Sequence, residues 1–276
     1  MRETAYAKIN LALHVRKREP DGYHRLETTF AFTEDGDELE VAEPERLQEL
    51  ELAVTGRFAR ALPVGERDSQ GNLVIRAGEA LRRHYGVTKG ARITLEKRLP
   101  VAAGIGGGSA DAAAALRLLT RFWDLPADPD TLHAIARTLG ADVPACIASR
   151  TVRGEGRGDD LVPVDGSALD GRPVLLVNPR VPVPTGPVFK AWDGVDRGPL
   201  GSDLVGRNDL EAPARAIAPV IGEVLEALAG ARLAQMSGSG ATCFALYQSE
   251  AERDSAETRI RAARPDWWTL ASRLRP

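Results

Sequence analysis

The most informative segment of this sequence reads Pro100-Val101-Ala102-Ala103-Gly104-Ile105-Gly106-Gly107-Gly108-Ser109-Ala110-Asp111. Four glycines within five residues, 104 to 108, leave the backbone N–H groups unobstructed by side chains. The alanine-rich residues that follow predict a helix from about Ser109 to Trp123. Accessible amides at the positive end of a helix dipole suit a phosphate group. The segment therefore predicts a phosphate-binding loop, and the alternative is a flexible glycine turn before an ordinary helix.

Other motifs for phosphate, ester or metal chemistry do not fit. The chain has no G-x-x-x-x-G-K-[ST] sequence, which excludes a Walker A loop. A dinucleotide fingerprint fits poorly, because Ser109 occupies its third glycine position and no strand-ending acid follows about twenty residues later. No G-x-S-x-G elbow supports serine-hydrolase chemistry. Three scattered histidines share no metal-ligand spacing and are expected to be structural, namely His14, His84 and His133.

Strands and helices surround the loop without strict alternation. Alternating or short apolar runs predict strands over residues 7–15, 25–33, 38–41, 49–55, 91–97, 173–177 and 242–247. Helical spacing and end signals predict helices over residues 72–85, 109–123, 128–139, 219–229 and 250–263. Prolines or glycines predict loops over residues 18–22, 181–187 and 237–240. The mixture predicts a two-lobed α+β fold. The Gly- and Asp-rich residues 154–171 place the boundary, with domains at 1–160 and 161–276.

Composition excludes several classes of protein. The 276 residues include 43% hydrophobic and 27% charged residues, which is typical of a globular chain. A net charge of -3 argues against a general nucleic-acid binder. No apolar stretch is long enough for a membrane span, and no signal-peptide region is seen. Two cysteines without a C-x-x-C pair exclude a disulfide scaffold and suit a reducing compartment, so we expect a soluble, cytoplasmic protein.

Lys8 and Asn10 lie two residues apart in the first predicted strand, so their side chains share a face. The other face carries Ile9, Leu11, Leu13 and Val15. The pair indicates either a polar site or an ordinary solvated lysine on a half-exposed strand.

Seven segments spread over nearly the whole chain resemble the GHMP small-molecule kinases. They are Ala7–Leu11, Asp21–His24, Asn72-Leu73, Gly104–Ala113, Gly140–Pro144, Pro184-Thr185 with Phe189, and Ser237–Ala241. The glycine loop points only to this superfamily. The sequences D-G-Y-H and G-A-D-V-P resemble the branch that phosphorylates the 2-hydroxyl of a cytidine-diphosphate-linked polyol. The resemblance implies a two-lobed α+β kinase with its active site in the cleft between the lobes.

The resemblance implies two catalytic residues. Asp142, in G-A-D-V-P, would accept the proton of the attacking hydroxyl, and Lys8 would pair with it and stabilise the developing charge. Without the resemblance, the residues favour Asp142 as the cap of a helix starting near Val143-Pro144 over a catalytic role.

The resemblance also implies ATP as the phosphate donor, with Mg²⁺ held mainly through its phosphates. The glycine loop from Pro100 to Ala110 would bind the phosphates, and Ser109 would contact phosphate or Mg²⁺ or simply cap the helix. Asn72 and Lys97 resemble nucleotide contacts, the alternatives being a helix cap and a solvated strand end. No acidic cluster with metal-ligand spacing is present.

For the second substrate, Tyr23, His24 and Phe189 resemble a cytosine pocket in which two rings stack on the base and His24 reads its edge. Tyr23 alternatively closes a local core. The remaining substrate contacts implied are Asn10, Asp142, Thr185, Gly238, Ser239 and Gly240. Thr185 alternatively braces the pocket, and the last three residues alternatively form a simple turn.

Two other functions remain open from the sequence. One is a GHMP kinase for another acceptor, of the homoserine or mevalonate type, for which a cytosine pocket has no purpose. The other is a catalytically silent nucleotide-binding protein, which would be expected to lack Lys8 or Asp142. Expected partners are small molecules only, without nucleic acid or membrane, for a monomer or weak homodimer.

Overall fold

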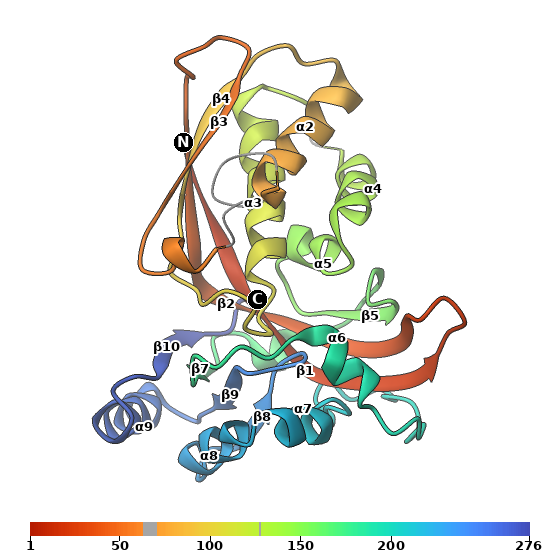
Figure 1. Cartoon of the computed structure of the whole chain (residues 1–276), viewed down its shortest axis with the longest axis vertical. Coiled ribbons are helices and arrows are strands. Elements are labelled where there is room, and N and C mark those ends of the chain that lie inside the picture. Colours follow the sequence, from red (N-terminus) through yellow and green to blue (C-terminus); the bar gives the residue numbers. More distant parts are fainter. Residues whose placement is uncertain (63–70, 127) are drawn as a thin grey trace. The chain divides into compact units, whose positions relative to one another are not determined.

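The structure is a computed structural model that describes residues 1–62, 71–126 and 128–276 (Figure 1). The chain forms two compact units. Unit 1 comprises Met1–Ala7, Asp35–Val101 and Gly107–Ala148, and unit 2 comprises Lys8–Glu34, Ala102–Gly106 and Ser149–Pro276. The two units are thus discontinuous in sequence, whereas the predicted domains 1–160 and 161–276 divide the chain once and stay a prediction.

Unit 1 combines antiparallel and parallel strands with a group of helices. It contains the start of β1 (Arg2–Arg18), the end of β2 (His24–Ala42), β3 (Leu50–Thr55) and β4 (Ala91–Glu96). Strand β4 pairs antiparallel with β2 and parallel with β3. The helical elements are η1 (Ala59–Ala61), α2 (Leu73–Tyr85), α3 (Gly107–Phe122), α4 (Pro129–Leu139) and α5 (Val143–Ala148). Figure 1 shows α2 to α5 gathered on one side of β3 and β4.

The ends of the helices in unit 1 follow the sequence signals. The Asn72 side chain accepts a hydrogen bond from the Val74 N–H, and Gly86 ends α2 with a left-handed φ of 67°. Asp128 caps α4 through the Thr131 N–H, and a proline follows in the first turn. Between them, α3 is buried along nearly its whole length, because its alanines let neighbouring elements approach closely.

Unit 2 contains two groups of strands. The beginning of β2 pairs with β5 (Val152–Gly156), and β5 pairs with β6 (Asp160–Pro163). A second sheet has the order β10-β7-β9-β8, with all its pairs antiparallel. Its strands are β7 (Pro173–Asn178), β8 (Leu233–Met236), β9 (Cys243–Leu246) and β10 (Trp268–Arg273). The unit also contains η2 (Ser167–Leu169).

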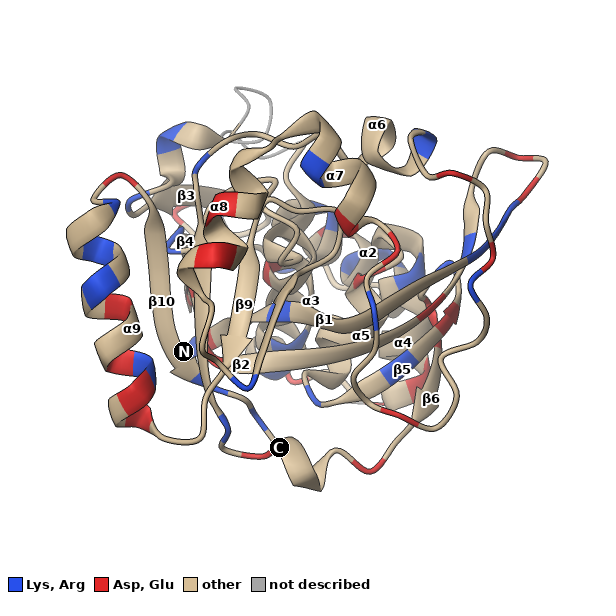
Figure 2. Ribbon diagram, turned by 90° about the horizontal axis from the view of Figure 1, so that it is seen from below, with Lys and Arg blue, Asp and Glu red and all other residues tan. Residues whose placement is uncertain are grey.

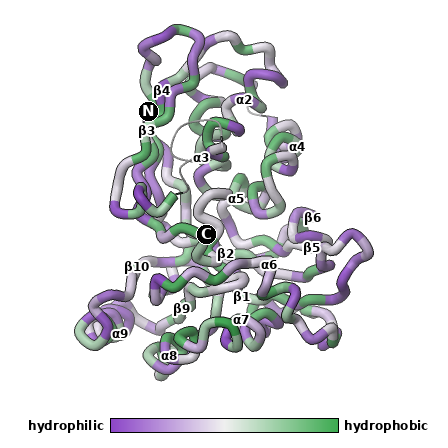
Figure 3. Tube along the Cα trace, in the orientation of Figure 1, coloured by the Kyte–Doolittle hydropathy of each residue, from purple (hydrophilic) through white to green (hydrophobic). Residues whose placement is uncertain are grey.

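The helices of unit 2 are α6 (Thr185–Lys190), α7 (Glu211–Ile217), α8 (Val220–Ala227) and α9 (Glu250–Ala263). Their apolar residues join a core with one face of β1 and the strands β7 and β9, including Leu13, Leu175, Ile221 and Ala245. Figure 3 shows α8 as mostly hydrophobic and α9 as mostly hydrophilic. Along α9, acidic residues lie mainly toward the start of the helix and basic residues mainly toward its end (Figure 2). The two helices therefore differ in how much of their surface the core covers.

Most predicted elements are confirmed, with informative exceptions. The runs 25–33 and 38–41 form one strand, β2, instead of two. Gly36 lies within it where a Cβ would be 1.9 Å from the Ala5 carbonyl oxygen, so the glycine permits close strand approach and does not mark a turn. The proposed boundary region 154–171 contains most of the β5–β6 hairpin. The predicted loop 181–187 ends in α6, whose first turn tolerates Pro187.

None of the helices in the described residues has the length and apolar character that crossing a membrane requires.

Candidate active site

Lys8 lies on the polar face of β1 and is buried, with 3% of its surface exposed. Its ammonium donates a hydrogen bond to Asn10 Oδ1 at 3.0 Å and lies 5.0 Å from the centre of the Phe30 ring. The alternative of a solvated surface lysine is therefore wrong. A cation buried in this way costs free energy unless nearby polar groups solvate it, which indicates a built polar site.

Asn10 is oriented by a chain of hydrogen bonds within unit 2. Its Nδ2 donates to Thr28 Oγ1 at 2.8 Å, and that hydroxyl donates to the Ala12 carbonyl at 2.6 Å. Because Nδ2 is fixed by Thr28, the Asn10 amide oxygen is held facing Lys8. The backbone N–H of Asn10 donates to Ser237 Oγ at 3.2 Å.

The first part of the glycine loop and the Gly-Ser loop (Ser237–Gly240) come together in unit 2. Ser237 Oγ donates to the Gly104 carbonyl at 2.9 Å, and the Lys8 N–H donates to the Ile105 carbonyl at 3.1 Å. Gly104 has a φ of 75°, and a Cβ there would be 2.6 Å from the Ser237 carbonyl oxygen. Glycine is required at this position by both its backbone angle and its contact. Two loops predicted independently therefore meet beside Lys8 and Asn10.

The Gly-Ser loop also contacts the residue predicted on the proline-rich segment. Thr185 Oγ1 and Ser239 Oγ are 3.0 Å apart and share a hydrogen bond. Gly238 and Gly240 have positive φ values of 56° and 87°. The structure thus brings together Asn10, Thr185 and the loop residues that the resemblance assigned to the second substrate.

The second part of the glycine loop opens α3 in unit 1. Helix α3 starts at Gly107, two residues earlier than predicted, so Gly107, Gly108, Ser109 and Ala110 supply its first turn. The N–H groups of a first turn have no partner within the helix. Ser109 is half-buried and Gly108 exposed, which leaves this end suited to an anion. Pro100 and Val101 belong to unit 1, whereas Ala102, Ala103 and Ile105 belong to unit 2 with Gly104 and Gly106.

Lys97 is 2% exposed, so the alternative of a solvated strand end is wrong. Its ammonium forms ion pairs with Asp37 and with Asp111, the latter at 2.7 Å. Asp37 also accepts the Leu99 N–H at 2.8 Å, which fixes the segment entering the glycine loop. Burial and the negative charge of Asp37 raise the pKa of Asp111 to about 8, against the opposing effect of Lys97. A nucleotide contact of Lys97 stays a prediction.

Asn72 and Asp142 both precede helices. Asn72 Oδ1 accepts the Val74 N–H at 2.9 Å, so the helix-cap interpretation is confirmed and the nucleotide contact stays a prediction. The Asp142 carbonyl accepts the Cys146 N–H at 3.1 Å, which places this residue immediately before α5. Asp142 is partly exposed and belongs to unit 1, whereas Lys8 belongs to unit 2. The role of Asp142 as base also stays a prediction.

The predicted cytosine residues gather aromatic and cationic neighbours in unit 2. The His24 ring lies 5.0 Å from the Phe189 ring, and Trp192 meets His24 edge-on at 5.8 Å. The Arg157 guanidinium lies 3.8 Å from the centre of the Tyr23 ring, and Tyr23 is 56% exposed. The alternative that Tyr23 closes a local core is therefore wrong.

Arg18 controls the protonation of His24. Its Nε donates to His24 Nε2 at 3.2 Å, so the neutral ring carries its proton on Nδ1. Desolvation and the charge of Arg18 lower the pKa of His24 below 6.5. His24 therefore presents a neutral ring at physiological pH. Arg18, Arg157 and Trp192 were not predicted, because single arginines and tryptophans carry no sequence signal of their own.

No group of three or more His, Cys, Asp or Glu side chains within the described ranges is arranged to hold a metal ion. Mg²⁺ commonly needs only one or two protein ligands when it is bound together with a nucleotide.

Comparison with known proteins decides the family. The pattern of the GHMP kinases N terminal domain matches residues 72–150, and that of the GHMP kinases C terminal domain matches residues 196–266. A 4-diphosphocytidyl-2-C-methyl-D-erythritol kinase of Rhizorhabdus wittichii is 58% identical, over 99% of this chain and 94% of the relative. The chain belongs to the 4-diphosphocytidyl-2-C-methyl-D-erythritol kinase family. A second such kinase, of Novosphingobium aromaticivorans, is 54% identical over 100% of this chain and 93% of its own length.

Solved structures agree with the family. A crystal structure of 4-(cytidine 5'-diphospho)-2C-methyl-D-erythritol kinase matches with a TM-score of 0.82 and 34% identity, over all of both chains. A homoserine kinase of Cytophaga hutchinsonii has a TM-score of 0.66 at 17% identity, which shows a shared fold alone. As a member of the 4-diphosphocytidyl-2-C-methyl-D-erythritol kinase family, the chain is an ATP-dependent small-molecule kinase with the α+β GHMP fold.

Proposed function

We propose that this kinase transfers the γ-phosphoryl group of ATP to the 2-hydroxyl of 4-diphosphocytidyl-2-C-methyl-D-erythritol, a step of non-mevalonate isoprenoid biosynthesis. The observation that carries the proposal is the 58% identity with the kinase of R. wittichii over 99% of the chain. The convergence of Lys8, Asn10 and the two glycine-containing loops supports it, because phosphoryl transfer depends on positioning and charge stabilisation.

Within this proposal, Asp142 accepts the proton of the 2-hydroxyl as that oxygen attacks the γ-phosphorus. Lys8 stabilises the charge that develops on the attacking oxygen, and its orientation is fixed by the Asn10 amide. The first turn of α3 binds the phosphates of ATP through its N–H groups and Ser109. Ser109 would help to hold Mg²⁺ together with ATP, and the ion would supply positive charge that offsets the charge of the phosphates.

The acceptor is proposed to bind through its two ends. Tyr23, His24 and Phe189 surround the cytosine ring, with the neutral His24 Nδ1–H as a donor to the base. Thr185 and the Gly-Ser loop contact the diphosphate. We further propose that the enzyme works in the cytoplasm as a monomer or weak homodimer, on small molecules alone.

The test is the release of ADP from ATP and Mg²⁺ with three acceptors, namely the cytidine compound, homoserine and mevalonate. Turnover with the cytidine compound alone is expected. Turnover with only another acceptor would retain the GHMP fold and refute the cytosine pocket. Absence of turnover with all three, in folded protein that binds ATP, would indicate a nucleotide-binding protein instead.

A further inference from the structure

Asn208 contacts the Gly-Ser loop and is not used by the proposed mechanism. It is 8% exposed, and its Nδ2 donates to two carbonyl groups, Met236 and Gly238, at 2.8 Å each. Its Oδ1 accepts the Leu210 N–H at 2.9 Å. Both N–H bonds of the amide and its oxygen are therefore engaged by backbone groups, and two of those groups belong to or border the loop.

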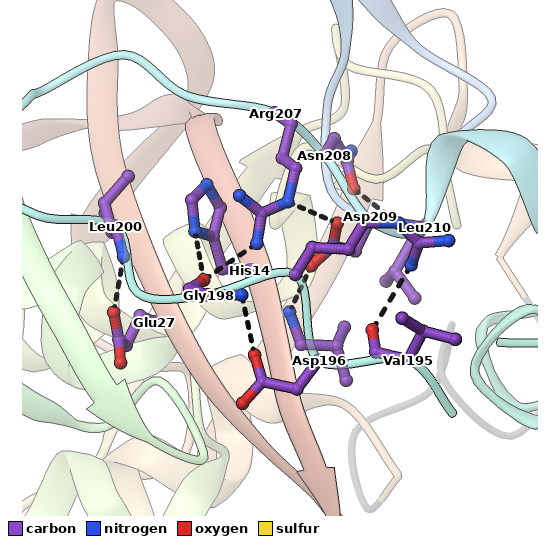
Figure 4. Close-up of polar contacts among 12 residues, drawn as sticks. His14, Glu27, Val195, Asp196, Gly198, Leu200, Arg207, Asn208, Asp209 and Leu210 are labelled. Carbon is purple, nitrogen blue, oxygen red and sulfur yellow. Dashed lines mark hydrogen bonds and ion pairs between the residues drawn. The ribbon is translucent and has the colours of Figure 1, made fainter. Parts of the chain in front are cut away.

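The segment that carries Asn208 is fixed to β1, the strand of Lys8 and Asn10. The Leu13 N–H donates to the Arg207 carbonyl, and the Asp209 N–H donates to the Leu13 carbonyl, both at 2.9 Å. The Asp209 carboxylate accepts the Val15 N–H at 2.8 Å and Arg207 Nε at 2.7 Å. Figure 4 shows Arg207, Asn208 and Asp209 beside His14, which lies on the same strand. Asn208 therefore connects β1 to the Gly-Ser loop.

Two backbone N–H groups of the Gly-Ser loop are available to another partner. Gly240 N–H donates to the Ser237 carbonyl and closes the turn. In the part of the chain that the structure describes, the N–H groups of Gly238 and Ser239 have no protein acceptor, although both residues are buried. Buried N–H groups without a partner are rare in folded proteins. Successive N–H groups beside a left-handed residue such as Gly238 form a concave anion site.

We propose that Asn208 is a positioning residue for the acceptor: it holds the Met236 and Gly238 carbonyls so that the Gly238 and Ser239 N–H groups face the diphosphate. The proposal rests on the proposed function for the identity of the anion. The loop has little freedom to compensate, because a Cβ at Gly238 would already be 2.9 Å from the Gly104 carbonyl oxygen.

The experiment compares Asn208→Asp with wild type. The substitution keeps the shape and the acceptor for Leu210 but places an oxygen against two carbonyl oxygens. We expect the KM of the cytidine acceptor to rise roughly tenfold or more, since two hydrogen bonds are lost, with the KM of ATP nearly unchanged. Asn208→Ser retains one donor and is expected to give a smaller rise in the KM of the cytidine acceptor. This second variant keeps the test available if Asn208→Asp does not fold.

Asp209→Asn is the matched control, because it is the neighbouring acid-to-amide exchange and contacts Val15 and Arg207 instead of the loop. It is expected to lower Tm without separating the two KM values. Unchanged KM values in folded Asn208→Asp and Asn208→Ser would overturn the proposal. So would a parallel rise of both KM values, which indicates a purely structural role.

A readout without turnover separates this proposal from the proposed function. Inorganic pyrophosphate is titrated by calorimetry into enzyme saturated with ADP, which occupies the nucleotide loop. Wild type is expected to bind it more tightly than Asn208→Asp, whichever acceptor the enzyme phosphorylates. Equal affinities, or no binding to wild type, would overturn the role of Asn208. Failure of the cytidine compound to turn over would refute only the proposed substrate.

Discussion

Asp142 immediately precedes α5, where its carbonyl already accepts a helical hydrogen bond while its side chain is partly exposed. If it is the base, Asp142→Asn removes proton acceptance but keeps size and polarity. We expect kcat to fall by a factor of about 10²–10⁴, with the KM values little changed. Steady-state kinetics of ADP release measure this change, and Tm shows whether α5 is intact. Full activity of the folded variant would refute the assignment.

Asp111 shares the buried Lys97 ammonium with Asp37. Its folded-state pKa of about 8 lies above the ordinary 3.8, so its protonated form favours folding. This contribution is complete below pH 3.8 and is lost as the pH rises through about 8. Asp111→Asn remains neutral, and we therefore expect the Tm difference, variant minus wild type, to increase from pH 5 to pH 9.

Thermal unfolding at matched ionic strength measures this dependence. Glu3→Gln is the control, since it is also an acid-to-amide exchange in the same unit, at a residue that pairs with Arg117 and not with Lys97. A Tm difference that is constant with pH would show that Asp111 is ionised throughout this range.

At the scale of single elements, the start of α2 allows the structural role of Asn72 to be distinguished from its predicted role in nucleotide binding. Asn72→Ala removes the cap that accepts the Val74 N–H and is expected to cost about 1 kcal/mol of stability. Asn72→Ser restores a capping oxygen and is expected to restore Tm. If Asn72 also contacts the nucleotide, both variants are expected to have a raised KM for ATP, because the shorter serine side chain cannot restore that contact. Recovery of both quantities would limit Asn72 to its cap.

The contact between the two loops gives another prediction. Gly104→Ala places a Cβ 2.6 Å from the Ser237 carbonyl oxygen at a φ of 75°, so one loop must move. We expect a loss of about 1–3 kcal/mol in stability and a large fall in kcat/KM. Gly186→Ala is the control, since a Cβ there meets nothing within 4 Å. Wild-type activity in Gly104→Ala would show that the loops need not touch for catalysis.

Elements with local signals could be predicted from the sequence, and those without them could not. Helix α2 has a cap at Asn72 and a left-handed Gly86, so both its ends follow from neighbouring residues. Strand β10 begins at Trp268 and is stabilised by pairing with β7, about ninety residues earlier in the chain, and no local pattern reports that pairing. The runs 25–33 and 38–41 are predicted as separate strands but form β2, in which Gly36 allows the close approach of Ala5, a contact that no local pattern reports.

In the candidate site, too, contacts between neighbours in sequence could be predicted and contacts between distant residues could not. Lys8 and Asn10 could be placed together because the period of a strand is local. The partners of Lys97 come from residues 37 and 111, and the atoms that hold the Gly-Ser loop come from residue 208. Such partners are set by tertiary packing, which a single sequence does not encode in spacing.

At the scale of the whole molecule, both cysteines are buried and neither forms a disulfide, and one lies in each unit. Burial raises the pKa of the Cys243 thiol, which further lowers its reactivity. We expect a thiol reagent that releases a coloured product to react negligibly with the native enzyme. In guanidinium, the same reagent is expected to react with both thiols. Rapid labelling of the native protein would contradict the packing of α5 or β9.

The discontinuity of the units has a consequence for synthesis on the ribosome. Unit 1 is complete in sequence at Ala148, whereas Lys8–Glu34 belongs to a unit whose other strands are translated later. The faces of these early strands therefore remain uncovered by the rest of unit 2 while more than a hundred further residues are translated. Strands β1 and β2 pair with each other, but the edge and the apolar face that they leave uncovered are prone to aggregate. We expect the nascent chain to depend on chaperones until translation supplies β7 and β9.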